Sequence, residues 1–332
     1  MSLDGAEIRV FHAGDEKEII DGLSSSLGRG VSLEDWSWSY PTLDGGRPVV
    51  VAVANGSVLA HVGGVISEFQ LNGRTVRALA VTDEYVLPTV GGAGERRRLL
   101  VDLLETLVAE FGGGDRPHLI YRLAGEGEAS GDSGPNGGAR VELPPVDVLS
   151  RRKAVRSPVR RLAFRAEPAR DWEPRLDDLW RRVRPSYPFA AVRNAETALH
   201  RHAGHPTVQR HRFLVFSRFF SRAVAFAVFE TNASRCRWVD LLWDHGEPGA
   251  LDLLCHLSRR LASQFGAMDE RIVLGGDAAA RARLERLGFR PEGVLEDLSF
   301  RVFSLPPGTR VGDLASRCYV TQTDLDPLRR IG

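Results

Sequence analysis

A glycine-rich segment, Val90-Gly91-Gly92-Ala93-Gly94, stands directly before a run that has the apolar stripe of a helix. Successive backbone N–H groups at the start of a helix can bind an anion, and glycines let that anion approach the main chain. Glu95 would place a negative charge beside the anion, and the arginines at 96–98 could compensate for it. The alternative is a plain glycine-rich turn, in which Glu95 only interacts favourably with the helix dipole.

Aromatic and histidine residues form two further groups. Trp36, Trp38 and Tyr40 could line a pocket for a sugar or an aryl amine, or they could pack the first helix against a sheet. The densest set of histidines in the chain comprises His200, His202, His205 and His211. None of these pairs has the i, i+4 spacing of two ligands on one helix face, so we expect no metal site.

A single carboxylate interrupts the most apolar run of the second half. Asp240 lies within Trp238-Val239-Asp240-Leu241-Leu242-Trp243, where an unpaired charge would be costly to bury. We expect a hydrogen-bonded structural residue, and a residue that faces a binding cleft is the alternative.

Periodicity predicts the elements that would position these residues. Asn55-Gly56 between two β-rich runs is a strong hairpin signal, and leucines repeat at helical spacing after the glycine segment. The predicted elements of the first half are a helix at 16–27, strands at 48–54, 57–66 and 76–86, a helix at 95–111 and a strand at 118–122. Residues 124–138 predict a loop, and the arginine-rich residues 150–161 predict a solvated connection.

The second half repeats this order. Its predicted elements are a helix at 171–183, strands at 212–220, 223–230 and 237–243, a helix at 249–265, a strand at 271–274, a helix at 278–287 and a strand at 298–303. Pro41-Thr42 matches Pro206-Thr207 and Gly56 matches Ser221, whereas the later helices match at an offset about ten residues smaller. We infer an internal duplication in which the second half lacks about ten residues, the glycine segment among them.

Length and composition limit the class of protein. The 332 residues suffice for two domains, and 44 basic against 43 acidic residues give no general attraction to nucleic acid or an anionic membrane. No apolar run of about 18 residues and no signal-peptide pattern occur, so we expect a cytoplasmic protein. Cys236, Cys255 and Cys318 are scattered, which predicts neither a disulfide framework nor a zinc site.

The order of elements resembles the GNAT superfamily of N-acetyltransferases, in a tandem bacterial form. In that family a strand ending in Val-x-Pro runs into Arg/Gln-x-x-Gly-x-Gly/Ala; here the stretch reads Val86-Leu87-Pro88-Thr89-Val90-Gly91-Gly92-Ala93-Gly94-Glu95-Arg96. Gly92 and Gly94 match, but Gly91 replaces the arginine or glutamine, and Arg96 replaces a small residue. Leu287-Gly288-Phe289 also resembles the end of the last helix in many of these enzymes, and residues 318–326 resemble the tail of uncharacterised bacterial tandem proteins, which often act in pathways that decorate sugars or other small molecules.

The resemblance implies a fold and a cofactor site. The fold class is α/β of the α+β kind, with two tandem GNAT-like domains at 1–150 and 151–304 and a packed C-terminal tail at 305–332. Acetyl-CoA would be the co-substrate, without a metal. The residues implied to bind it are Tyr85 or Val86, whose N–H would polarise the thioester carbonyl, and Gly91, Gly92, Ala93, Gly94, Glu95 and Arg96 around the pyrophosphate.

The resemblance also implies a mechanism in which an amine attacks the thioester and a carboxylate removes its proton. Asp83 and Glu84 are adjacent, so their side chains leave opposite faces of a strand. One could be the base while the other meets solvent or an arginine, or both could be ordinary strand-end carboxylates. Tyr121 could protonate the leaving thiolate or could simply pack.

Two functions from different classes remain. One is an N-acyltransferase that acts on a small-molecule amine or amino sugar, with Trp36, Trp38 and Tyr40 at the acceptor and the second domain shaping that site. The other is a non-catalytic binding or scaffold protein with a decayed CoA site, which the missing arginine favours. We expect no nucleic-acid or membrane partner, and a homodimer is compatible with the sequence.

Overall fold

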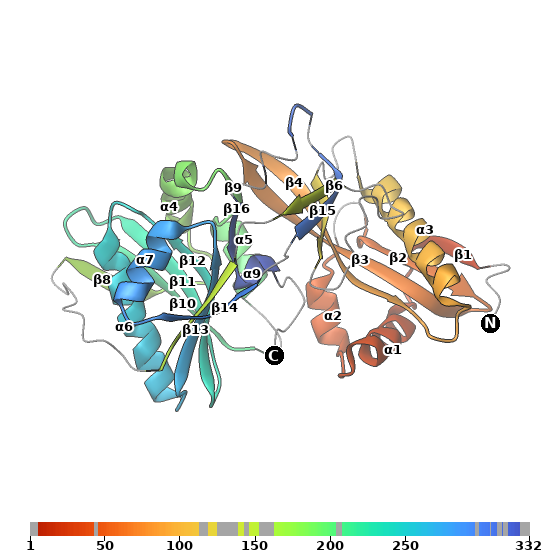
Figure 1. The fold of residues 1–332 in the computed structure, drawn as a ribbon, viewed down its shortest axis with the longest axis horizontal. Coiled ribbons are helices and arrows are strands. Elements are labelled where there is room, and N and C mark those ends of the chain that lie inside the picture. The colour runs from red at the N-terminus through yellow and green to blue at the C-terminus, as the bar shows by residue number, and fades with distance from the viewer. Residues whose placement is uncertain are drawn as a thin grey trace.

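The computed structural model describes residues 6–42, 46–112, 119–124, 139–142, 146–152, 163–203, 208–295, 299–305, 307–310, 314 and 318–325. Figure 1 shows an N-terminal half, coloured red to yellow, beside a C-terminal half, coloured green to blue. Each half is a twisted sheet with helices on its faces. The predicted α/β fold of two similar halves, with mostly antiparallel sheets flanked by helices, is therefore confirmed.

The first half contains β1 (Glu7–Val10), α1 (Glu16–Leu27), α2 (Leu33–Ser39), β2 (Val49–Ala54), β3 (Ser57–Leu71), β4 (Arg74–Val86), α3 (Ala93–Phe111), β5 (Leu119–Ala124) and β6 (Ala139–Glu142). Strands β1 to β4 pair antiparallel in order, and β4 pairs parallel with β5. Alternate residues of the strands face opposite sides. Leu79 and Val81 therefore pack under the leucine stripe of α3, whereas Val49 and Val51 pack under α1 and α2.

The second half contains β8 (Phe164–Pro168), α4 (Arg175–Val183), the short helix η1 (Arg184–Ser186), β9 (Phe189–Ala191), α5 (Ala195–His202), β10 (Arg210–Ser217), β11 (Ala223–Thr231), β12 (Arg235–Trp243), α6 (Pro248–Gln264), β13 (Asp269–Gly275), α7 (Ala278–Arg286) and β14 (Arg290–Leu295). Strands β8, β10, β11 and β12 pair antiparallel, and β12 pairs parallel with β13. In both halves, then, the strand before the main helix and the strand after it are parallel neighbours.

The internal repeat is visible in local geometry. Gly56 and Ser221, which the sequence aligns, both turn their hairpins with positive φ, 76° and 51°. The prediction that the missing residues include the glycine segment needs correction, because most of the shortfall lies in the central hairpin. Strands β3 and β4 have 15 and 13 residues, whereas β11 and β12 have 9 each.

The two halves exchange their last strands. β7 (Val146–Arg151), which precedes the second half in sequence, lies between β13 and β14. Reciprocally, β15 (Ser299–Ser304) lies between β5 and β6, and Figure 1 shows this blue strand next to β6. The division at residue 150 thus describes the sequence repeat, while the strands on each side of it cross over.

This exchange overturns one expectation. Arg151 was predicted in a solvated connection, but it ends β7 and is buried. Its guanidinium pairs with Glu270 at 2.7 Å and donates to the carbonyls of Leu287 and Cys255. Residues 153–161 of that arginine-rich run lie outside the described residues, as do residues 125–138 of the predicted loop.

The extended tip of the β3–β4 hairpin joins the halves. Residues Phe69–Leu71 of β3 pair with β9, and β9 pairs parallel with β16 (Cys318–Thr321). β16 in turn pairs with β13 and is followed by the short helix α9 (Gln322–Leu325). The predicted tail at 305–332 therefore includes a strand that hydrogen-bonds in the centre of the continuous sheet.

Candidate functional site

The glycine segment forms an exposed loop at the start of α3. Gly92 precedes the helix in an extended conformation, and Gly91 has a φ of 38°. A Cβ built on Gly92 or Gly94 would meet no atom within 4 Å, so the space beside both is open. The N–H groups of the first turn have no partner within the helix. The loop therefore presents donors to a place that an anion could occupy.

Glu95 and Arg96 fold back on this loop. The Glu95 carboxylate accepts a hydrogen bond from the Gly92 N–H at 2.9 Å. A Cβ on Gly91 would collide with that carboxylate unless the glutamate moved, and the positive φ of Gly91 separately favours glycine there. Arg96 donates to the carbonyls of Val90 and Gly91 at 3.2 and 2.9 Å. Arg96 thus binds two carbonyl groups of the loop, and Glu95 already accepts the hydrogen bond of one of the loop's N–H groups.

The end of β4, which leads into this loop, pairs irregularly with both neighbouring strands. Its pairing with β5 stops at Val81 and Arg122, although β4 continues to Val86. A bulge interrupts its pairing with β3, and Asp83 adopts a φ of 53°. Beyond the bulge, Leu87 donates to Leu59 of β3 at 2.9 Å. Because antiparallel donors alternate between edges, the Val86 N–H points away from β3, to the side of β5.

The two adjacent carboxylates face opposite sides, as predicted. Asp83 accepts a hydrogen bond from the hydroxyl of Tyr40 at 2.7 Å, on the side of α1 and α2. The Tyr40 hydroxyl also lies 3.2 Å from Thr82. Glu84 forms an ion pair with Arg122 of β5 at 2.8 Å, across the point where the two strands stop pairing. Only Asp83 therefore faces the aromatic residues.

His61 joins this arrangement, and sequence reasoning missed it. Its ring lies fully buried, stacked on Tyr85 at a centroid distance of 5.6 Å and edge-on to Tyr40 at 6.0 Å. Its Nδ1 donates to the carbonyl of Asp83 at 2.8 Å and so holds the bulge. Burial lowers the pKa of His61 to about 4 and raises the pKa of the Tyr40 phenol. The available signal was a lone histidine in the apolar run 58–62.

The remaining candidates of the first half lie in packed surroundings. Trp36 is buried among Ile19, Leu23 and Tyr40, with the guanidinium of Arg47 4.9 Å from its ring centre. Trp38 on the same helix is half-buried. Tyr121 is buried on β5 with its ring edge-on to Phe69, and burial raises the pKa of its phenol. The structure thus brings together Tyr40, Asp83, His61 and Tyr85. Tyr121 instead packs where β3 pairs with β9, at the contact between the two halves.

The corresponding loop of the second half has different chemistry. Asp244 accepts from the Gly246 N–H at 3.0 Å and pairs with Arg182 at 3.2 Å. Glu247 pairs with Arg222 at 3.4 Å, and Pro248 begins α6 without an N–H to donate. The loop before α6 therefore carries two carboxylates that pair with arginines of the chain, and its first helical residue has no N–H.

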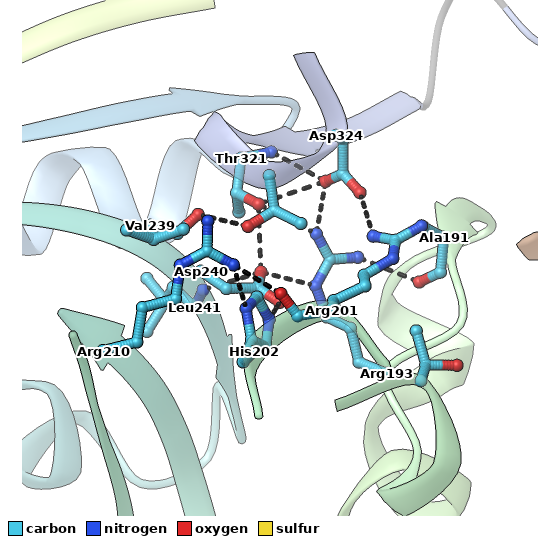
Figure 2. A network of polar contacts seen from close by, with 12 residues as sticks. Ala191, Arg193, Arg201, His202, Arg210, Val239, Asp240, Leu241, Thr321 and Asp324 are labelled. Atoms are coloured by element: carbon cyan, nitrogen blue, oxygen red, sulfur yellow. Dashed lines mark hydrogen bonds and ion pairs between the residues drawn. The ribbon is translucent and has the colours of Figure 1, made fainter. Parts of the chain in front are cut away.

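Asp240 belongs to a buried polar network, shown in Figure 2. It accepts from Arg193 at 2.9 Å, from Thr321 at 2.9 Å and from the Leu241 N–H at 2.9 Å, and it lies 3.2 Å from His202 Nε2. The pKa of this carboxyl lies below its usual range, because the effects of Arg193 and His202 outweigh burial. The structural interpretation of Asp240 is thus confirmed.

The predicted histidine group is dispersed. His202 is buried in this network, His200 is exposed on α5, and His211 lies 3.3 Å from Thr231. His205 lies outside the described residues. The part of the chain that the structure describes contains no cluster of histidine, cysteine and carboxylate side chains arranged for a metal ion. No described helix has the length and apolar character needed to cross a membrane.

Comparisons with solved structures define the fold. A GCN5-related N-acetyltransferase from Anabaena variabilis matches with a TM-score of 0.64 at 9% identity, over 89% of this chain and 72% of that one. A tandem GNAT protein from the clavulanic acid biosynthesis pathway matches with a TM-score of 0.54 at 13% identity, over 92% and 100%. Saccharomyces cerevisiae N-myristoyltransferase, solved with myristoyl-CoA, matches with a TM-score of 0.59 at 12% identity, over 91% and 79%.

The chain therefore has the fold of the GNAT proteins, twice in tandem. No model of a known protein family matches the sequence, and no curated protein matches it significantly.

Proposed function

We propose that the first half binds an acyl-CoA and transfers its acyl group to the amine of a small molecule or amino sugar. The observation that carries this proposal is the conjunction of an open glycine loop at the start of α3 with a Val86 N–H directed to the side of β5. These two features supply donors for a pyrophosphate and for a thioester carbonyl on one continuous stretch of chain.

Each residue near this stretch has a proposed role. The N–H groups of residues 91–95 bind the pyrophosphate, once the Glu95 carboxylate has left Gly92. The N–H of Arg96 already donates to the Gly92 carbonyl within the helix. The Val86 N–H polarises the carbonyl, because the Tyr85 N–H lies on the edge that pairs with β3. Acetyl-CoA is the acyl donor with which this assignment is tested.

Asp83 is the proposed base. It faces Tyr40 and is held by the His61 contact to its carbonyl, whereas Glu84 is engaged by Arg122. The amine nitrogen attacks the carbonyl carbon, its proton passes to Asp83 directly or through water, and the C–S bond breaks to release the thiolate. The thiolate is proposed to take its proton from water, because Tyr121 is buried against Phe69 with a raised pKa and still pairs with Ala80, before the two strands separate.

The acceptor is proposed to bind on the side of α1 and α2. Trp36, Trp38 and Tyr40 come from one short helix and its end, and Tyr40 reaches Asp83. Of the three rings only that of Trp38 is partly exposed, so Trp38 is proposed to contact a sugar or an aryl amine, while Trp36 and Tyr40 hold the helix in place. The second half would then contribute to the acceptor side through the strands that join it to β3.

Two observations favour the alternative, a non-catalytic protein with a decayed CoA site. Glu95 occupies a loop donor, and glycine stands at position 91 where the family has arginine or glutamine. Calorimetric titration of acetyl-CoA into the full chain, followed by thiol-release assays with a panel of amines, separates the two. Binding with turnover supports the transferase. Failure to bind at millimolar acetyl-CoA would leave the scaffold function.

A further inference from the structure

The C-terminal segment, residues 318–325, lies where the parallel strands of the second half stop pairing. β12 and β13 pair only as far as Trp238 and Ile272, although both strands continue. One edge of β13 is covered by β7 along its length to Gly275. β16 also pairs with Leu274 and Gly275, so it must use the other edge of β13, the one that β12 has left.

The segment also satisfies the free edge of β12. Asp244 donates to Val224 of β11, so by alternation residues 239, 241 and 243 face away from β11. Their carbonyls accept hydrogen bonds from the hydroxyls of Thr323 at 3.0 Å, Tyr319 at 2.5 Å and Tyr187 at 3.1 Å, respectively. Side-chain hydroxyls thus replace the backbone ladder that β12 loses, and two of the three belong to the C-terminal segment.

Buried charges fasten the same segment. Figure 2 shows Thr321 and Asp324 of the segment around Arg193 and Asp240. Arg193 pairs with both carboxylates, and Arg201 pairs with Asp324 at 3.0 Å. Gly276 packs so closely on the carbonyl of Cys318 that a Cβ there would lie 2.0 Å from it. The C-terminal segment is therefore packed closely against the end of β13 as well as against β12.

The first half differs at the corresponding position. By the internal repeat, β4, α3 and β5 correspond to β12, α6 and β13. No side chain of the described residues bonds to the backbone of Val86, whereas β12 is bonded by residues from the end of the chain. The two positions are thus alike in topology, and among the residues that the structure describes, side chains of the protein bond to the strand edge only at the second.

We infer that residues 318–325 act as a built-in ligand that permanently fills, in the second half, the position that acyl-CoA takes in the first. This inference rests on the proposed function. It follows that each chain takes up one acyl-CoA, and that the second half serves to support the first through β16 and β9.

The first test asks whether the hydroxyl contacts hold the segment, and it does not need acetyl-CoA. Cys318 is buried in the segment, and Cys255 is buried in the core of the second half. Pulsed alkylation of the full chain with mass spectrometry gives the labelling rate of each thiol. The double substitution Tyr319→Phe, Thr323→Val should raise the Cys318 rate relative to Cys255 about tenfold or more, since two buried hydrogen bonds are lost.

The matched control is Tyr187→Phe, which removes a hydroxyl that also donates to a carbonyl of β12 but comes from a residue outside the segment. It should leave the ratio of the two rates within about twofold of the wild type. An unchanged ratio in the double variant, or an equal rise in the control, would overturn the inference that these contacts fasten the segment.

The second test adds acetyl-CoA to the wild type. We expect a calorimetric stoichiometry of one per chain and an unchanged labelling rate for Cys318. Two molecules bound per chain, or faster Cys318 labelling at saturating acetyl-CoA, would show that the segment yields to the ligand and would overturn the inference. Absence of any binding would instead overturn the proposed function, while the labelling ratio would still decide whether the segment is a fixed part of the fold.

Discussion

The carboxylate of Glu95 lies 2.9 Å from the backbone nitrogen of Gly92 and accepts its hydrogen bond. A carboxylate oxygen has the charge sign and the acceptor geometry of a phosphate oxygen. Glu95 therefore competes, from within the chain, for a donor that the proposed pyrophosphate would use. Glycine at position 91 leaves room for this carboxylate, because a side chain there would collide with it.

Replacing Glu95 by glutamine should strengthen acetyl-CoA binding. The change removes a negative charge beside the pyrophosphate and weakens the competing hydrogen bond, and we expect about a tenfold lower Kd, or about 1.4 kcal/mol. Calorimetry measures the affinity. Glu105→Gln, an exposed change of the same charge on the same helix, is the control and should have little effect. A higher Kd for Glu95→Gln than for the wild type would mean that the Glu95 carboxylate stabilises the complex with acetyl-CoA.

Replacing Gly94 by valine should abolish acetyl-CoA binding while the fold is kept. The space beside Gly94 is open, and an exposed helix position tolerates valine at a cost below about 1 kcal/mol. The new side chain would hold the pyrophosphate away from the N–H groups. Loss of two charge-assisted bonds of roughly 1.5–3 kcal/mol each weakens affinity a hundredfold or more. Equal affinity in both proteins, at an unchanged melting temperature, would make this loop a simple turn.

The sequence predicted most helices and strands of the fold because their signals are local. The leucine spacing of α3 and the Asn55-Gly56 turn each depend on neighbours within a few residues. The strand exchange could not be predicted in this way. Whether Val146 pairs with Gly275 of β13 depends on a partner far away in the chain, and periodicity carries no such information.

The candidate site was predictable to the same extent. Asp83 and Glu84 were found from their place in the strand before the glycine segment. Because adjacent residues of a strand face opposite sides, their opposite directions could also be predicted. Their different partners, Tyr40 and Arg122, are set by the packing of α2 and by the register of β5. His61 was missed because a single histidine in an apolar strand has no local pattern, and only its contacts with Asp83 and Tyr85 connect it to the site.

The two adjacent carboxylates should differ in their effect on catalysis. If Asp83 is the base, Asp83→Asn should lower kcat by about 10²- to 10⁴-fold with little change in acetyl-CoA affinity. Glu84→Gln keeps a partner for Arg122 and should lower kcat by less than about tenfold. Steady-state rates with the best amine of the panel give the comparison. A larger loss for Glu84→Gln would move the base to the other face of β4.

Stability should fall as the pH falls from about 6.5 to about 4. Burial lowers the pKa of both His61 and His202 to about 4, against about 6.5 in an unfolded chain. In this window the unfolded chain binds protons that the folded chain refuses, so each histidine contributes a slope of up to about 1.4 kcal/mol per pH unit. His245, whose pKa Asp277 raises, acts oppositely, since its stabilisation is lost as the pH rises.

Urea unfolding at pH 7.5 and 5.0 measures this dependence. His61→Gln should reduce the difference between the two pH values, because one of the two buried histidines no longer titrates. His200→Gln changes an exposed histidine and serves as the control, with the difference unchanged. The same pH difference in His61→Gln as in the wild type would show that the His61 ring becomes protonated without unfolding.

Replacing Arg193 by methionine should destabilise the chain far more than the same change at Arg181. Arg193 is 2% exposed and pairs with Asp240 and Asp324, so its loss leaves two buried carboxylates without their shared cation. Breaking such a buried pair costs about 3–5 kcal/mol. Arg181 and Asp178 are each 70% exposed, and the loss of that pair should change the free energy of unfolding by less than about 0.5 kcal/mol. Urea unfolding of both variants gives the comparison.

Because Asp324 belongs to the segment that fills the second half, Arg193→Met should also speed the labelling of Cys318 relative to Cys255. A small and equal loss of stability in the two variants would mean that water reaches the network and that Arg193 does not fasten the C-terminal segment.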